Sequence, residues 1–263
     1  MSNIRIGIGG WTFEPWRGGT FYPDKLPQKR ELEFASRALT AIEINGTYYS
    51  GFKPATFASW RDAAPDGFVY AVKASRYCTT RKVLADAGPS IEKFVGQGIV
   101  ELGHKLGPIL WQFMATKRFD PVDFGAFLKL LPAKHEGVAL RHAVQVRHES
   151  FAVPQLVAMC REAGVAIVFA DSPQYPAIAD VTADFVYARL ESGEDANPLG
   201  YPEAEIGRWA DVAKCWAGGG RPAALPYVTA QTPPATPRET FVFFIHGGKV
   251  RAPAAARALI ARV

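Results

Sequence analysis

The chain has few cysteines and lacks any long uncharged run that could cross a membrane. Its three cysteines, Cys78, Cys160 and Cys215, are widely spaced, form no Cys-x-x-Cys pair and have no histidine at zinc-ligand spacing. The longest uncharged run, between Arg221 and Arg238, contains five prolines, which a membrane-spanning helix would not tolerate. The sequence therefore argues against a disulfide framework, a structural zinc site and a transmembrane helix.

Signals for export and for several enzyme classes are also missing. The first residues enter a strand-like segment without the basic and apolar regions of an export signal, so we expect a cytoplasmic protein. The sequence has no nucleophile elbow and no His-Glu-x-x-His pair, which weighs against serine hydrolases and zinc peptidases. Gly7, Gly9 and Gly10 precede neither a helix nor a Lys-Ser/Thr pair, so they do not form a phosphate loop. No cofactor motif is present.

Charge of one sign is not concentrated anywhere in the sequence. The 30 Lys and Arg residues against 25 Asp and Glu residues give a net charge of +5 and a pI near 9.1. The cations occur as doublets such as Lys29-Arg30 and Lys117-Arg118. Dispersed charge is typical of a solvated surface, whereas one basic patch would favour a nucleic-acid partner.

Short apolar segments alternate with helical patterns along the 263 residues, of which 48% are hydrophobic. Eight segments are typical of buried strands: Ile4–Gly9, Ala41–Asn45, Phe68–Ala74, Ile109–Phe113, Ala139–Arg147, Ala166–Ala170, Phe185–Leu190 and Phe241–His246. Eight strands with intervening helices favour a parallel β/α barrel of the TIM type over an open sheet, and about 250 residues suffice for one such domain. We therefore predict a single barrel domain over residues 1–263.

Helical patterns lie between these segments. In Ser90–Leu106 the apolar side chains recur at the i, i+3 and i+4 spacing of one buried helix face. Similar stripes predict helices over Lys53–Ala63 and Pro202–Trp216, and two more that begin at Pro121 and Pro154.

Two stretches depart from the regular alternation. Residues 171–184 are few and include Pro173 and Pro176, so the sixth helix is expected to be short or missing and the barrel irregular there. Residues 217–239 carry a run of three glycines, several prolines and no periodicity. We interpret them as a flexible surface insertion on the barrel face opposite the usual active site.

Strand alternation predicts which polar side chains share the barrel interior. Side chains out of phase with the branched apolar ones point inward, and barrel enzymes keep their chemistry at the carboxyl ends of the strands. The residues placed there are Glu43, Asn45, Lys73, Gln112, Gln145, Arg147, Tyr187 and Arg189, with Asp171 and His246 at the ends of the sixth and eighth strands.

These side chains predict an anion site. Lys73, Arg147 and Arg189 outnumber Glu43 and Asp171, so the mouth of the pocket is net positive and suits a phosphate, carboxylate or sulfate. A small anionic molecule is therefore the expected partner.

Four residues are candidates for catalysis: Glu43, Lys73, His148 and Asp171. Glu43 beside a cation stays ionised and could act as a base, while His148 could exchange protons near neutral pH. In the competing interpretation, Glu43 and Lys73 form an ion pair that only fills the barrel, His148 points into the helix layer, and Asp171 caps a turn.

Aromatic residues follow the first two strands. Trp11 and Trp16 in the first loop could cover the pocket mouth and stack on a base or sugar, although aromatic side chains in such a loop often only pack it onto the barrel. Tyr48 and Tyr49 present the same choice, and alternation predicts that only one of them lines the pocket.

Several ordered motifs match a known pattern: Gly9-Gly10-Trp11, Phe21-Tyr22-Pro23, Glu43-Ile44-Asn45-x-Thr47-Tyr48-Tyr49, Val72-Lys73-Ala74-x-Arg76, Lys105-Leu106-Gly107-Pro108, Gln112, Arg147-His148-x-Ser150-Phe151, Asp171 and Tyr187-x-Arg189. Over nearly its whole length the chain resembles the YecE-like family, domain of unknown function 72. The resemblance implies an irregular β/α barrel with a site at the carboxyl ends of the strands, in bacterial and archaeal proteins whose activity is not established.

The chain departs from that family's pattern at several positions. Gln145 stands where the pattern has a glutamate, and Glu191 stands where it has a histidine. Ile245 and His246 replace two asparagines, and Ala255 replaces another. One carboxylate and one histidine are thereby lost, which predicts that the family's activity is altered or absent.

Three functions fit the sequence. The first is a barrel enzyme of the hydrolase or the lyase and isomerase class that acts on a small anionic or phosphorylated substrate. The second is a nucleic-acid-binding protein or phosphodiesterase, which a basic rim would favour. The third is a non-catalytic binding barrel, which a sealed Glu43–Lys73 pair would favour. A divalent metal is a weaker alternative, because Glu43, Asp171 and His148 do not form a ligand motif.

Overall fold

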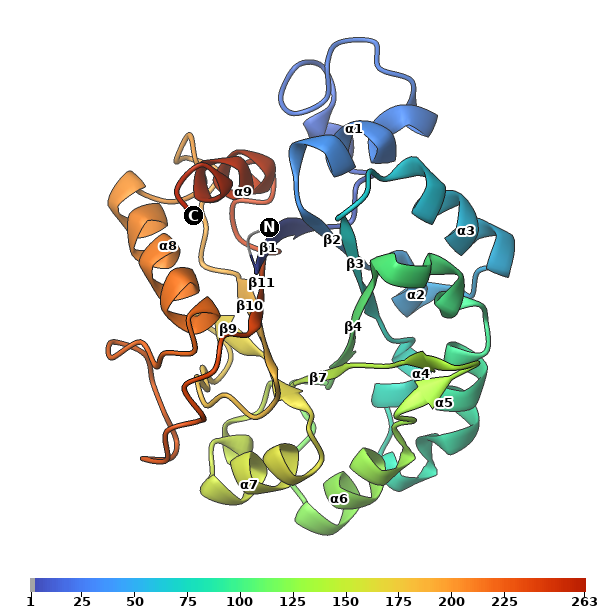
Figure 1. Ribbon diagram of the computed structural model, residues 1–263, viewed down its shortest axis with the longest axis vertical. Coiled ribbons are helices and arrows are strands. Elements are labelled where there is room, and N and C mark those ends of the chain that lie inside the picture. Colours follow the sequence, from blue (N-terminus) through green and yellow to red (C-terminus); the bar gives the residue numbers. More distant parts are fainter. Residues whose placement is uncertain (1–2) are drawn as a thin grey trace.

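Parallel strands form a ring at the centre of the structure, and helices surround it (Figure 1). The computed structural model describes residues 3–263. Around the ring the strands are β1 (Ile4–Gly9), β2 (Ala41–Ile44), β3 (Val69–Lys73), β4 (Leu106–Gln112), β7 (His142–Gln145), β8 (Ala166–Ile167), β9 (Phe169–Asp171), β10 (Phe185–Leu190) and β11 (Glu239–Phe244). Because β11 pairs in parallel with β1, the last strand closes onto the first, and the predicted TIM-type barrel is confirmed.

The sixth strand of the barrel is split at Val168. β8 pairs with β7, and β9 pairs with β10, so the two halves serve different neighbours. The amide of Val168 donates to the carbonyl of Val144 at 2.9 Å, which holds the bend against the fifth strand. The predicted continuous strand Ala166–Ala170 is therefore two short strands, and the barrel is nearly closed through them.

The fifth strand is shorter than predicted. The antiparallel strands β5 (Lys134–His135) and β6 (Val138–Ala139) form a small hairpin before it, in which Gly137 adopts a φ of +80°. β7 begins only at His142, so the expected strand Ala139–Arg147 loses its first residues to the hairpin.

Within residues 3–263 the chain forms nine α-helices and several short 3-10 helices. They surround the barrel (Figure 1). The α-helices are α1 (Glu31–Ala38), α2 (Gly46–Tyr49), α3 (Pro54–Ala63), α4 (Arg76–Thr79), α5 (Gly88–Val95), α6 (Pro121–Leu130), α7 (Pro154–Glu162), α8 (Glu203–Ala217) and α9 (Ala252–Ile260). The 3-10 helices are η1 (Glu14–Trp16), η2 (Gln28–Arg30), η3 (Leu84–Ala87), η4 (Ile99–Lys105) and η5 (Glu149–Phe151). Within that part of the chain, no helix combines the length and apolar character that a membrane crossing needs.

The predicted helix Ser90–Leu106 is interrupted. α5 ends at Val95, and the chain then passes through Gly98, which has a φ of +106° and lies so close to Pro54 that a Cβ atom would clash at 2.6 Å. A 3-10 helix, η4, continues to Lys105, and Leu106 already belongs to β4. The apolar period runs across the break because both helices bury the same face against the barrel.

The alternation of strand side chains separates an inner core from an outer one. The inner core gathers Ala41, Val69, Ala71, Leu110, Ala143, Ala166, Val168, Phe185, Tyr187, Phe241 and Phe243. The alternate residues, such as Ile42, Ile44, Val186 and Leu190, pack in the larger core under the helices. The phase predicted for these strands is therefore the observed one.

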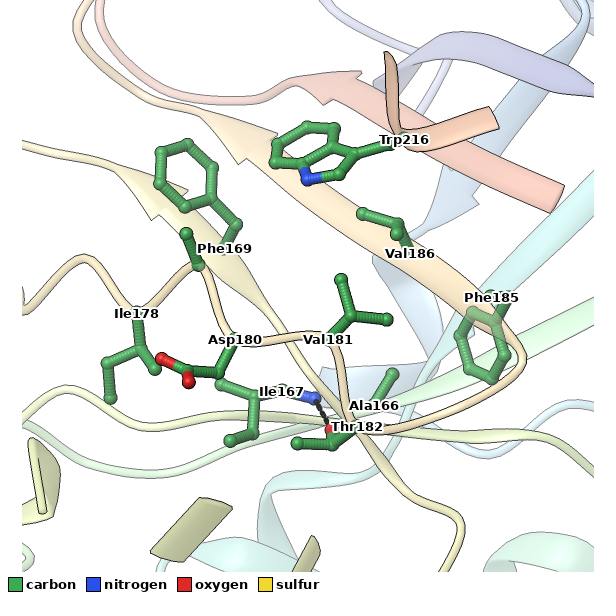
Figure 2. Close-up of a pocket in the computed structure, with 11 residues that line it drawn as sticks. Ala166, Ile167, Phe169, Ile178, Asp180, Val181, Thr182, Phe185, Val186 and Trp216 are labelled. Carbon is green, nitrogen blue, oxygen red and sulfur yellow. Dashed lines mark hydrogen bonds between the residues drawn. The ribbon is translucent and has the colours of Figure 1, made fainter. Parts of the chain in front are cut away.

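Within the described residues no helix lies between β9 and β10. A coil takes the place of the sixth helix there. Figure 2 shows this coil beside β8, β9 and β10. Ile178 and Val181 are buried there with Phe169 and Trp216, and Thr182 Oγ1 accepts a hydrogen bond from the amide of Ile167 at 3.0 Å. The short, proline-containing connection covers the outer face of the barrel with side chains instead of a helix.

The insertion at residues 217–239 connects α8 to the start of β11, at the end of the barrel opposite the carboxyl ends of the strands. The carboxylate of Asp180 accepts hydrogen bonds from the amides of Val228 at 2.7 Å and Thr229 at 3.1 Å. The amide of Ala179 donates to the carbonyl of Pro226 at 2.9 Å. The insertion thus docks on the coil that replaces the sixth helix, and its flexibility stays a prediction.

Candidate active site

An ion pair lies in the barrel interior just below the carboxyl ends of the strands. Arg189 on β10 reaches Glu43 on β2 with two nitrogens, Nε to Oε2 at 3.1 Å and Nη2 to Oε1 at 3.2 Å. Tyr187 donates its hydroxyl to Glu43 Oε2 at 2.7 Å. The carboxylate is fully buried and Arg189 is 2% exposed. Strand alternation therefore predicts these residues correctly, but the partner of Glu43 is Arg189 and not Lys73.

The environment of Glu43 keeps this carboxylate ionised. Burial alone opposes ionisation, but the charges of Arg189 and Lys73 and the hydrogen bonds from Tyr187 and Arg189 outweigh it. The pKa of Glu43 lies below its ordinary value of 4.5 as a result. Because both carboxylate oxygens hold hydrogen bonds, Glu43 positions Arg189 and is a poor base.

A polar network extends from Arg189 to two further strands. Its Nη1 donates to Gln145 Oε1 at 2.6 Å and to Glu191 Oε1 at 2.7 Å. Gln112 donates to the same Gln145 oxygen at 2.6 Å, and Gln145 Nε2 donates to Glu191 Oε1 at 3.1 Å. Each of these side chains is buried. A satisfied network of this kind fixes the guanidinium in one orientation.

Lys73 ends β3 and points into the barrel, as predicted. Its Nζ lies 4.3 Å from the centroid of the Tyr48 ring, and within residues 3–263 it forms no ion pair. Burial, followed by repulsion from Arg189 and Arg147, lowers the pKa of Lys73 from 10.5 to about 7, although Glu43 opposes the shift. The side chain therefore changes its protonation state near neutral pH.

Arg147 follows β7 and also faces inward. Its guanidinium stacks over the Tyr175 ring at 4.4 Å from the centroid, and its buried Nε has no hydrogen-bond partner. Burial, followed by repulsion from Arg189, lowers the pKa of Arg147 below its ordinary value of 12.5. Since such a pKa starts so high, the group stays cationic and carries donors that nothing in the described chain satisfies.

A cavity of about 520 Å³ brings these groups together at the carboxyl ends of the strands. It is lined by Gly9, Gly10, Thr12, Asn45, Gly46, Tyr49, Lys73, Arg147, Ser172, Pro173, Gln174, Tyr175, Arg189, Glu191, Ile245, His246 and Lys249. Lys73, Arg147, Arg189 and Lys249 are its cations, and Glu191 is its carboxylate. The excess of positive charge expected from the sequence is present on this wall.

Five predicted site residues line this cavity directly: Asn45, Lys73, Arg147, Arg189 and His246. Tyr48 supports Lys73 from the side, and Tyr49, which is 67% exposed, borders the cavity. Tyr49 therefore lies on the wall in place of the predicted Tyr48, because both tyrosines belong to the helix α2, to which strand alternation does not apply. Gln112 and Glu43 lie in the network beneath Arg189.

Two of the proposed catalytic residues lie elsewhere. His148 lies beyond the end of β7 and is not among the residues that line the cavity; it caps η5, where its ring Nδ1 accepts a hydrogen bond from the amide of Ser150 at 3.1 Å. Asp171 shares the outward phase of Phe169 and lies in a separate groove beside the start of α8, where burial raises its pKa. Neither His148 nor Asp171 therefore contributes to the cavity wall.

Trp11 does not close the pocket mouth. Its ring packs edge-on against Trp60 of α3, with 5.2 Å between the ring centroids. Trp16 is 1% exposed and donates its indole N–H to the carbonyl of Lys249 at 2.9 Å. Both tryptophans pack the first loop onto the barrel, and neither is among the residues that line the cavity.

Strand alternation does not predict several residues of the cavity wall, among them Lys249 and Tyr175. Both lie in loops, where no strand alternation exists to predict direction. Lys249 Nζ lies 4.3 Å from the Phe13 ring centroid, and burial lowers its pKa. Glu191 could have been found, because it lies two residues beyond Arg189 and so keeps the inward phase.

No metal centre is evident in the described chain. Within residues 3–263 no three His, Cys, Asp or Glu side chains are grouped as metal ligands. Asp171 lies in the groove beside α8, His148 caps η5, and Glu43 is bound to Arg189. The three side chains therefore do not form one site.

Comparison with known proteins identifies the family. The model of a protein family of unknown function, DUF72, matches residues 5–263, while no curated protein matches the sequence. A DUF72 family protein from Thermotoga maritima is similar in structure with a TM-score of 0.71 and 20% identity, over 98% of this chain and 96% of that chain. One from Enterococcus faecalis has a TM-score of 0.66 and 17% identity, over 97% and 93%.

A more distant similarity shows only the fold. A family GH18 chitinase from Chromobacterium violaceum has a TM-score of 0.55 and 13% identity, over 98% of this chain and 82% of that chain. The match of the family model over almost the entire sequence is the specific result. The chain belongs to the DUF72 family, the YecE-like family that its motifs resemble.

Proposed function

We propose that the cavity binds a small anionic or phosphorylated substrate and that the protein is a barrel enzyme using acid–base chemistry there. The observation that carries this proposal is a pair of cations on the cavity wall, Lys73 and Arg147. Both are largely buried, and neither has a carboxylate partner among residues 3–263. Burying a charge without a partner costs several kcal/mol, and a bound anion would offset that cost.

Lys73 is the acid–base group that the geometry supports best. Its pKa of about 7 allows it to give and take protons near neutral pH. Glu43 is shielded by its hydrogen bonds to Arg189 and Tyr187, and His148 caps η5 and does not line the cavity. The proposal therefore moves proton transfer from Glu43 and His148 to Lys73, and leaves Arg147 and Arg189 to bind the anion.

Calorimetric titration with sodium sulfate at low ionic strength tests the anion site. We expect saturable binding that Lys73→Met and Arg147→Met each weaken by about tenfold, since each change removes one charge-assisted contact of roughly 1.5–3 kcal/mol. Lys134→Met on the β5–β6 hairpin and Arg257→Met on α9 remove exposed cations far from the cavity and serve as matched controls. Absence of saturable binding, or equal loss in the controls, would reject the site.

A second candidate function is single-stranded nucleic-acid binding. A groove lined by Thr47, Tyr49, Ser50 and Tyr77, among others, adjoins the cavity, and Tyr49 borders both. Tyr49 and Tyr77 are 67% and 60% exposed, as stacking on bases requires. Fluorescence anisotropy with a labelled oligonucleotide separates the two functions. Binding that falls steeply with salt and needs both tyrosines supports this second function, and no binding at low salt excludes it.

A further inference from the structure

Lys73 differs from the other polar groups of the barrel interior because it lies on the cavity wall and its amine forms no hydrogen bond within the described chain. Glu43, Tyr187, Arg189, Gln145 and Gln112 are all held by hydrogen bonds to one another. Lys73 lines the cavity, and within residues 3–263 its Nζ lies over the face of the Tyr48 ring and forms no hydrogen bond or ion pair. A primary amine without a hydrogen-bond acceptor, at the wall of a cavity that admits small molecules, is placed to act as a nucleophile.

We infer that Lys73 forms an imine with the carbonyl carbon of a small aldehyde or ketone that carries a carboxylate or phosphate. The inference rests on the proposed function, because the anionic group of that substrate is the anion that Arg147 and Arg189 bind. It names the substrate class and directs the chemistry toward the lyase and isomerase class, where an imine withdraws electrons from a neighbouring bond.

The reaction is balanced without a further reagent. The lone pair of the neutral amine adds to the carbonyl carbon, a C–N bond forms, and the carbonyl π electrons move to oxygen. The nitrogen gives up a proton to that oxygen. The C–O bond of the resulting carbinolamine then breaks with loss of one water molecule, and the C=N bond forms. Hydrolysis of the imine reverses each step and returns the free lysine.

The charges around Lys73 favour the neutral amine that this reaction needs. Arg147 and Arg189 face it from β7 and β10, Glu43 and Glu191 oppose them from β2 and from the end of β10, and Tyr48 covers one side from α2. The cations and burial prevail, so about half of the amine is unprotonated near pH 7. An exposed lysine with an ordinary pKa near 10.4 is almost wholly protonated there.

Pyridoxal 5′-phosphate, an aldehyde that carries a phosphate, is a suitable probe. The protein is incubated with it at substoichiometric concentration, reduced with sodium borohydride, digested and mapped by mass spectrometry. We expect one dominant adduct, on Lys73, that excess sulfate suppresses. Its rate of formation should rise about tenfold in all from pH 6 to 8 and then level off, whereas the rate at an ordinary lysine keeps rising about tenfold per pH unit.

Three variants make the experiment decisive. Lys73→Arg keeps the positive charge but cannot form an imine, so it should still bind sulfate and give no adduct. Lys73→Met should bind sulfate about tenfold more weakly and give no adduct, and Lys134→Met should behave as the unmodified protein. An adduct on Lys249 or one spread over surface lysines would overturn the inference. If sulfate binds but Lys73 stays unlabelled, the imine is wrong and the anion site stands. If sulfate also fails to bind, the proposed function fails with it.

Discussion

Gln145 donates its side-chain N–H to the carboxylate of Glu191 across 3.1 Å, in the buried network around Arg189. In the family pattern that the chain resembles, a glutamate stands at position 145 and a histidine at position 191. The carboxylate that the pattern has at position 145 is therefore supplied here by Glu191. The network retains a carboxylate beside the guanidinium, supplied from β10 instead of β7.

This exchange predicts strong coupling between positions 145 and 191. Gln145→Glu alone would bring two carboxylates into contact and replace the donor that Glu191 needs, so we expect a loss of about 1–3 kcal/mol in the free energy of unfolding. Adding Glu191→His should recover most of that loss. Urea unfolding of the two single variants and the double variant measures the coupling, and strictly additive effects would contradict it.

Glu43→Gln removes the charge that compensates Arg189. Because the guanidinium stays buried, we expect the free energy of unfolding to fall by about 3–5 kcal/mol. Tyr187→Phe is the matched comparison, since it deletes only the hydroxyl bonded to Glu43 and should cost about 1 kcal/mol. Chemical denaturation ranks the two. A smaller effect for Glu43→Gln than for Tyr187→Phe would show that the ion pair is not what holds this region.

Sulfate affinity should depend on pH through Lys73. Below about pH 7 the side chain is cationic and attracts the anion, and above it the charge is lost, so affinity falls as pH rises. Bound sulfate favours the charged form, which moves the fall to somewhat higher pH. Calorimetry at about pH 6 and 9 should show affinities that differ by roughly tenfold or more. A Lys73→Met protein that keeps the full pH dependence would assign it to another group.

Asp180 is expected to hold the insertion of residues 217–239 in place. Its carboxylate accepts from the backbone of Val228 and Thr229, so Asp180→Ala would leave these amides without a partner. Limited proteolysis should then cut within the insertion several times faster, while sulfate binding at the opposite end of the barrel stays unchanged. Asp184→Ala, a change on the same coil, serves as the control. Unaltered cleavage would show that other contacts hold the insertion.

Strand alternation made much of the interior predictable from the sequence. Glu43, Lys73, Arg147 and Arg189 point inward because each lies out of phase with branched residues that must face the helices. The pairing within the interior was not predictable, since Arg189 and Lys73 are both close enough in the ring to compete for Glu43. The longer guanidinium, anchored also by Glu191, is the one that reaches it.

The predictions were wrong for residues at or beyond the ends of the strands. Asp171 ends β9, and His148 lies beyond the end of β7. At such positions a difference of one residue in where the strand ends reverses the predicted direction of the side chain. The loop that carries Trp11 is held by contacts with Trp60, which are distant in sequence and leave no local signal. The same holds for Lys249, which joins the cavity from a turn after β11.

The split of the sixth strand at Val168 gives the barrel a seam. Two residue pairs join β7 to β8 and three join β9 to β10, against five between β1 and β11. Local opening costs least where the fewest hydrogen bonds between strands must break. We therefore expect the amides of β8 and β9 to exchange with deuterium earlier than those of β1. Residues 172–175, which wall the cavity, follow β9 directly. We therefore expect local opening at this seam to displace these residues of the cavity wall before it affects β1.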